Sequence, residues 1–288
     1  MTDFLNVDFV WIVATGLAAS FLCSWLGLHL VLRRQAMMSD ALSHSVLPGL
    51  VLVYILFGSL NSFGILLGAT VTGVVTALLI EVLKRQQLLK EDAATGLVFT
   101  TLFAIGVVLL QVYAGNAHID TQCLLYGELA FVPLENLIWG MPQSFVHIGS
   151  LLLSMGALLI LFHKELLLTA FHEEMAQSSG LPVRAIQYGL MIAVSAVIIA
   201  CFQALGAVLV IAFLVLPASF GLLLSRDFKS TLLWSWALSL VCVPIATWIA
   251  FVIDNNIAAN IVALEFGVFV VAFIVQREIE KRVRVRIH

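Results

Sequence analysis

Charged residues are scarce in this sequence. Asp, Glu, Lys and Arg make up 11% of its 288 residues, whereas roughly a quarter of residues are charged in soluble globular proteins. Apolar residues make up 62%, and the mean hydropathy is +1.10. Because a helix that crosses a bilayer needs about 20 mostly apolar residues, this composition predicts an all-α polytopic membrane protein.

Several motifs are absent, and each absence excludes a class of function. There is no GxxxxGK(S/T) phosphate-binding loop, so we do not expect this chain to hydrolyse ATP by that route. There is no HExxH or GxSxG motif, which excludes the most recognisable intramembrane proteases and hydrolases. The first nine residues lack the Lys and Arg of a cleaved signal peptide, so we expect the first span to be retained. The cysteines have no metal-site or disulfide spacing and are interpreted as small apolar residues: Cys23, Cys123, Cys201 and Cys242.

The 14 Lys and Arg residues occur in clusters separated by long stretches that contain none. Short cytoplasmic loops retain cations, so we place every cluster inside the cell, and each stretch between clusters then holds an even number of spans. The predicted spans are residues 9–32, 37–58, 62–83, 93–113, 141–163, 183–203, 205–224, 231–253 and 258–276. We therefore expect about eight or nine transmembrane helices. If the hairpin over 183–224, which must turn at 203–206, does not cross fully, the count falls toward seven or eight. The N-terminus is then outside and the C-terminus cytoplasmic.

The segment MMSDALSHSVLPGL contains an unusual pair for a membrane span. Asp40 and His44 are four residues apart and lie on one helical face. Ionisable residues inside a span are costly and usually face a cavity or a partner. A carboxylate oxygen beside an imidazole nitrogen suits a divalent metal. The same residues also fit a structural acid–histidine bond or a helix cap, since Ser39 or Asp40 can begin the helix.

Pro48 follows this pair and has no N–H, so the carbonyl of His44 loses its usual helical donor. The freed oxygen can line a pathway, and with Gly49 the helix can be interrupted, as at midplane sites of transporters. A simple kink with a neighbouring serine as donor is the alternative. Zn²⁺ takes about four ligands, but one chain offers two, so a metal site predicts a dimer with the site on its twofold axis. Glu265 has no partner visible in the sequence.

The segment KELLLTAFHEEMAQSSGLP, residues 164–182, is amphipathic and acidic. We expect a short cytoplasmic helix, stopped by Gly180 and Pro182, that presents apolar residues to a soluble partner. A helix lying in the membrane interface is the alternative, but such helices are more often basic. The residues at helical spacing are Leu168, Phe171 and Met175.

The sequence resembles the manganese/zinc/iron permease family of ABC importers over nearly its whole length. The resemblance rests on five segments in the family's order: MSDALSHSVLPGL at 38–50, EDAATGLVFTTLFAIGVVLL at 91–110, HIDTQCLLYGEL at 118–129, the segment 164–182, and QALGAVLVIAFLVLPASFGLLL at 203–224. The family more often has Gly at Ser39, and Thr or Ser at Leu216, but neither departure removes a proposed ligand.

The resemblance implies a single transmembrane permease domain over 1–288 with a fold similar to the vitamin B12 type (type II) of ABC importer. It implies that Asp40 and His44 coordinate the metal, from both chains of a permease dimer. It further implies that 164–182 couples to the ATPase, and that 277–288 is a cytoplasmic tail. The expected coupling residues are Leu168, Phe171, Glu174, Met175 and Gly180, and the candidate pathway or gate residues are Ser43, Pro48, Glu128 and Glu265.

The partners that the resemblance implies are a second permease chain, identical or paralogous, a cytoplasmic ABC ATPase dimer and an extracytoplasmic metal-binding protein, in a bacterial inner membrane and without nucleic acid. No cofactor is bound permanently; the cargo is Mn²⁺, Zn²⁺ or Fe²⁺, and ATP acts only through the partner. Glu128 in LYGELAFVP resembles the manganese- or iron-directed members more than the zinc-directed ones, and of these metals manganese is favoured. The alternative is a stand-alone proton-coupled secondary metal carrier with His44 or Glu265 as its proton site.

Overall fold

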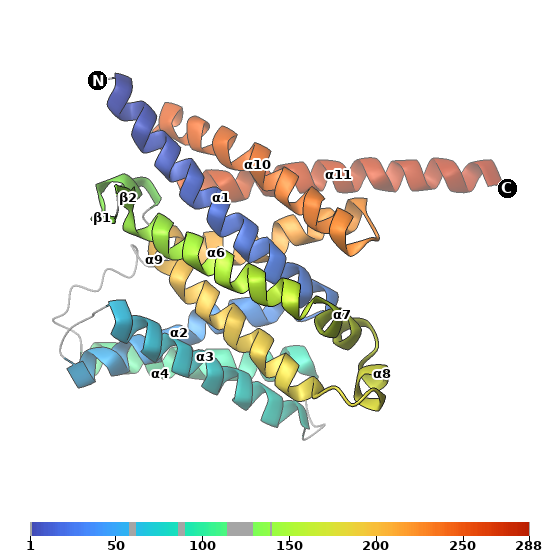
Figure 1. Ribbon diagram of the computed structural model, residues 1–288, viewed down its shortest axis with the longest axis horizontal. Coiled ribbons are helices and arrows are strands. Elements are labelled where there is room, and N and C mark those ends of the chain that lie inside the picture. Colours follow the sequence, from blue (N-terminus) through green and yellow to red (C-terminus); the bar gives the residue numbers. More distant parts are fainter. Residues whose placement is uncertain (1, 58–61, 86–89, 114–128, 139, 288) are drawn as a thin grey trace.

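The long apolar stretches of the sequence fold into helices that pack side by side (Figure 1). The computed structural model describes residues 2–57, 62–85, 90–113, 129–138 and 140–287. Its elements are α1 (Thr2–Leu32), α2 (Ala36–Phe57), α3 (Ser62–Arg85), α4 (Glu91–Tyr113), the 3₁₀ helix η1 (Leu129–Leu134), β1 (Leu137–Ile138), β2 (Met141–Pro142), α6 (Gln143–Leu161), α7 (His163–Phe171), α8 (Glu173–Ser178), α9 (Val183–Leu224), α10 (Phe228–Ile253) and α11 (Ile257–Ile287). The two strands form a small antiparallel hairpin that leads into α6.

Seven helices of the described chain are long and apolar enough to cross a membrane. They are Val7–Leu32, Ala36–Phe57, Asp92–Tyr113, Gln143–Leu161, Val183–Phe202, Phe228–Ile253 and Ile257–Ile279, and they coincide with seven of the predicted spans. The other two predicted spans, 62–83 and 205–224, contain the shorter apolar helices Thr70–Leu83 and Leu209–Leu224. The prediction of an all-α polytopic membrane protein is confirmed.

A bend at Gly206 divides α9 into two helical halves. Gly206 has φ 75° and ψ 162°, a conformation that glycine adopts without the penalty of a Cβ atom. The two halves run in different directions from this bend (Figure 1). The expected turn at 203–206 is therefore a single-residue bend with no intervening loop.

The basic segments of the sequence gather at one end of the bundle. The C-terminal ends of α1 and α3, the segment α7–α8 and the chain's C-terminus all lie opposite the N-terminus (Figure 1). This arrangement is the one expected when each stretch between basic clusters leaves that end and returns to it. The predicted tail 277–288 continues α11 as a helix to Ile287, which projects beyond the other helices.

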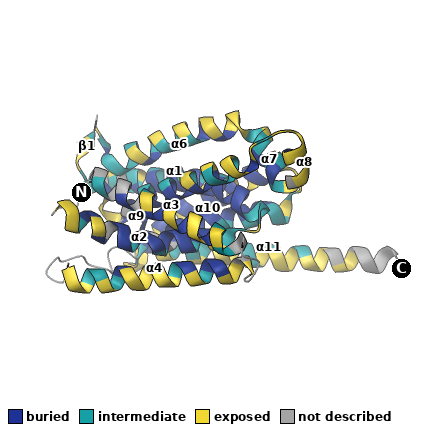
Figure 2. Cartoon of the chain, turned by 90° about the horizontal axis from the view of Figure 1, so that it is seen from below, coloured by how far each residue is buried: buried dark blue, intermediate teal, exposed yellow. Residues whose placement is uncertain are grey.

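Buried residues concentrate in α1 and α9, at the centre of the bundle, whereas the outward faces of α4 and α6 are exposed (Figure 2). Several helices cross at glycines, which let two backbones approach closely. A Cβ atom on Gly27 of α1 would lie 2.6 Å from the carbonyl carbon of Leu214 in α9. A Cβ atom on Gly106 of α4 would lie 2.8 Å from Cδ of Pro48 in α2.

We expect Gly27→Ala to destabilise the protein by about 1–3 kcal/mol, because the new methyl group meets backbone atoms that cannot rotate away. A lower Tm in detergent, measured by the loss of the monodisperse species on heating, checks this. The matched control is Gly149→Ala in α6, where an added Cβ has no neighbour within 4 Å. Equal Tm values for the two variants would contradict the close crossing of α1 and α9.

Candidate metal-binding site

Asp40 and His44 lie on one face of α2, close to the basic end of the bundle. Nε2 of His44 is 3.4 Å from Oδ1 of Asp40, and the two side chains are 33% and 37% exposed. Two ligands of one tetrahedral ion, each about 2.0–2.2 Å from the metal, are separated by roughly 3.3–3.6 Å. The two atoms therefore have the separation that a shared metal ion requires.

The ring of His44 is oriented by two aromatic residues of α4. It stacks on Phe99 at 6.0 Å between ring centroids and meets Phe103 edge-on at 5.7 Å. These contacts fix the imidazole on the side of α2 that faces α4, while a third of the side chain stays accessible. Neither aromatic residue was singled out from the sequence, although both lie in the segment 91–110 that carries the family resemblance.

Two serines next to the pair bond to the α2 backbone. Oγ of Ser39 donates to the carbonyl of Ala36 at 2.7 Å, and Oγ of Ser43 donates to the carbonyl of Asp40 at 2.8 Å. Because α2 begins at Ala36, neither Ser39 nor Asp40 caps the helix. The candidate gate residue Ser43 is buried, so the structure places it away from the accessible surface that Asp40 and His44 share.

The helix continues through Pro48, and α2 is one element from Ala36 to Phe57, so of the two alternatives the interruption is not seen. Pro48 packs on Gly106 of α4, where the missing side chain makes room for the proline ring. The candidate residue Pro48 therefore fixes the distance between α2 and α4. Glu128 lies outside the described residues.

Glu265 of α11 is fully buried where α11 packs against α9 and α10, whereas Asp40 and His44 lie on α2, which packs against α3, α4 and α9. Its Oε1 accepts a hydrogen bond from Ser239 of α10 at 3.1 Å, and the hydroxyl of Ser20 in α1 donates to that of Ser239 at 2.6 Å. The described contacts thus make Glu265 part of a polar link between three helices.

The segment 164–182 forms two short helices where one was expected. α7 ends at Phe171 and α8 begins at Glu173, because His172 between them has φ −141° and ψ 76°. Gly180, with φ 79°, follows α8, as expected for a residue that stops a helix. Among the expected coupling residues, Phe171 and Met175 are 60% and 57% exposed, Glu174 is exposed and Leu168 is half-buried. The break therefore leaves two exposed apolar side chains at the basic end.

The described residues contain no group of three or more His, Cys, Asp or Glu side chains that could hold a metal ion within one chain. As candidate ligands, Asp40 and His44 would supply two donor atoms, and water or another chain would supply the others. The fold is that of a polytopic membrane protein, and Asp40 and His44 form a candidate half-site for a divalent cation on an accessible face of one spanning helix.

Comparison with known proteins identifies the family. A model of the ABC 3 transport family matches residues 7–276, and the chain belongs to this family as an integral-membrane permease of the metal ABC importers. It is 43% identical over 209 residues to the zinc transport system membrane protein TroD of Treponema pallidum (strain Nichols). The aligned residues cover 72% of this chain and 57% of that relative. It is 38% identical over 257 residues to the manganese transport system membrane protein MntD of Bacillus subtilis (strain 168), covering 86% and 87% of the two chains.

The fold is similar to that in the structure of PsaBC from Streptococcus pneumoniae in complex with Fab. The TM-score is 0.77 at 25% sequence identity, over 91% of this chain and 90% of the other. The family resemblance drawn from the sequence is confirmed, and the chain is a multi-pass membrane subunit of a bacterial transporter family.

We expect Glu265→Ala to destabilise the protein by about 2–4 kcal/mol, since it removes an acceptor from Ser239 and leaves a cavity. Glu265→Gln keeps both the volume and an acceptor oxygen, and should retain most of the stability. Thermal unfolding in detergent compares the variants, with Glu174→Gln at an exposed position as the control. If Glu265→Ala unfolded at the wild-type temperature, the buried polar link would have no structural role.

Proposed function

We propose that this chain is the permease subunit of an ATP-driven importer that moves a divalent transition metal, preferably Mn²⁺, across the bacterial inner membrane by alternating access. The observation that carries the proposal is the 3.4 Å approach of His44 and Asp40 on an accessible face of a membrane-spanning helix. Such residues are retained in a membrane where they bind a partner or a cargo.

The proposed site contains ligands from two permease chains. Asp40 and His44 of this chain supply one oxygen and one nitrogen, and a second chain, identical or paralogous, supplies the others. Mn²⁺, Zn²⁺ or Fe²⁺ can occupy such a site. If each chain supplies one Asp and one His, two of the four protein ligands are carboxylate oxygens. Carboxylate ligands suit Mn²⁺. The names of the relatives include both a manganese and a zinc transport protein, which agrees with this group of metals.

The energy for transport comes from a cytoplasmic ABC ATPase dimer that docks on α7 and α8. Phe171 and Met175 support this assignment because exposed apolar side chains at the end of a permease fit a protein partner. The basic clusters place this end in the cytoplasm and the N-terminus outside. An extracytoplasmic metal-binding protein delivers the ion at the opposite end.

A stand-alone proton-coupled carrier would need His44 or Glu265 as its proton site. His44 lies on α2 against Phe99 and Phe103, whereas Glu265 bonds within α1, α10 and α11. The described contacts do not join these two residues into a proton relay. The importer is therefore the function that the geometry supports best.

We expect Asp40→Ala and His44→Ala each to lower Mn²⁺ uptake by about 100-fold or more, because even residues that only support a metal ligand contribute about 10–100-fold. Uptake into proteoliposomes that contain the complete complex, with ATP supplied to the ATPase, measures the loss. The permease should still copurify with the ATPase, because α7 and α8 are unchanged.

The matched control is Ser45→Ala, which alters a buried side chain of the same helix whose hydroxyl bonds to the Leu42 carbonyl. It should transport at nearly the wild-type rate. Normal uptake by both Asp40→Ala and His44→Ala would exclude them as cargo ligands. Uptake by the permease alone, without ATP or ATPase, would instead support the carrier.

A further inference from the structure

A side-chain hydrogen bond between Arg33 and Thr169 joins α7 to the C-terminal end of α1. Nη2 of Arg33 donates to Oγ1 of Thr169 at 2.6 Å and approaches the carbonyl of Leu166 at 3.5 Å. Oγ1 of Thr169 donates its own proton to the Leu166 carbonyl at 3.1 Å, so its lone pairs are available to accept from the guanidinium. Thr169 is buried, which strengthens a bond to a charged donor.

The chain passes from Arg33 into α2 through a turn that is hydrogen-bonded throughout. Arg34 adopts the left-handed conformation, with φ 59°. Its N–H bonds to the Val31 carbonyl at 3.0 Å, and the N–H of Gln35 bonds to the Leu30 carbonyl at 2.9 Å. This is the Schellman arrangement that closes a helix end. The Gln35 carbonyl then accepts from the N–H of Met38 at 3.0 Å, so the same turn is tied to the first turn of α2.

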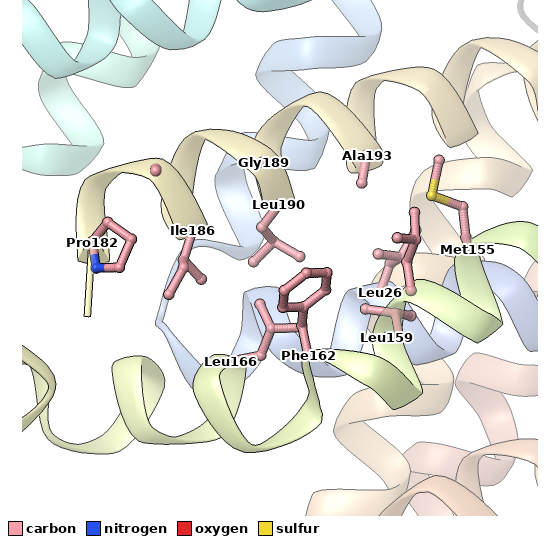
Figure 3. A pocket seen from close by; sticks show the side chains of 12 residues that line it. Leu26, Met155, Leu159, Phe162, Leu166, Pro182, Ile186, Gly189, Leu190 and Ala193 are labelled. Atoms are coloured by element: carbon pink, nitrogen blue, oxygen red, sulfur yellow. The ribbon is translucent and has the colours of Figure 1, made fainter. Parts of the chain in front are cut away.

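On its other side α7 lies beside α9 along an apolar groove of about 390 Å³ that is open at the surface (Figure 3). Phe162 and Leu166 line the groove from α6–α7, and Ile186 and Leu190 line it from α9. α7 still contacts α9 beside this groove. The hydrogen bond from Arg33 to Thr169 is a polar contact that joins α7 to the end of α1.

We propose that Arg33 is a positioning residue that passes movement of α7 through the 33–35 turn to α2, and so to Asp40 and His44. This inference rests on the proposed function, in which a partner ATPase moves α7. Asp40 follows Met38 within the first two turns of α2, so a shift of this turn displaces the metal ligands together with the helix. Arg33 touches no cargo, and its role is to couple ATP hydrolysis to transport.

The experiment measures Mn²⁺ imported per ATP hydrolysed by the complete complex in proteoliposomes. We expect Arg33→Gln and Thr169→Val each to lower this ratio about tenfold, as loss of a hydrogen bond to a charged donor typically does. ATP hydrolysis should continue in both variants. The double variant should be no worse than either single one, because the two substitutions remove the same interaction.

Two further variants separate coupling from folding and from charge. Thr169→Ser keeps the hydroxyl and should retain the wild-type ratio. Arg34→Asn removes one positive charge at the neighbouring position, and asparagine tolerates the left-handed conformation of that residue. This variant should also retain the wild-type ratio of Mn²⁺ imported per ATP hydrolysed.

An unchanged ratio in Arg33→Gln and Thr169→Val would overturn the proposal. A parallel fall of uptake and hydrolysis would overturn it too, because that result indicates only loss of folded complex. If the wild-type complex hydrolysed ATP without importing any divalent metal, the proposed function itself would fail, which is a separate outcome.

Discussion

A carboxylate and an imidazole that stand 3.4 Å apart on a membrane helix are the constraint on which the rest of the structure depends. Neither group is stable in lipid without a partner, and two ligands do not complete the shell of a transition metal. In the proposed function, the face of α2 that carries Asp40 and His44 meets the cargo and a second set of ligands. The pair is partly accessible, whereas the neighbouring residues Ala41, Leu42 and Ser45 of α2 are buried against other helices.

Close packing joins α2 to its neighbours α3 and α4. Pro48 sits on Gly106 of α4, and a Cβ atom on Gly68 of α3 would lie 2.8 Å from the Gly49 carbonyl oxygen, so the three helices have little freedom relative to one another. A second group, α1, α10 and α11, is joined by the Ser20, Ser239 and Glu265 link. The two groups meet at α9 and at the 33–35 turn. The proposed alternating access would use two such groups, and Arg33 at the start of the turn bonds to Thr169 of α7, in the segment proposed to dock the ATPase.

The sequence predicts the local features of this structure and misses the distant ones. Charge clusters locate the spans, Gly206 falls within the predicted turn, and helical spacing brings Asp40 and His44 together, because each depends on neighbours in the chain. The break at His172 carries no glycine or proline signal. Arg34 takes a position where glycine is usual. The bond from Arg33 to Thr169 spans 136 positions, and no local pattern encodes such a contact.

The central claim is that one metal ion is shared by two permease chains. Its most direct test is the number of Mn²⁺ ions bound per assembled complex, measured by electron paramagnetic resonance after unbound metal is removed. The account predicts a single bound ion for each pair of chains, which is lost when this chain carries Asp40→Ala. One ion in every chain, or an ion retained by the Asp40→Ala complex, would contradict it.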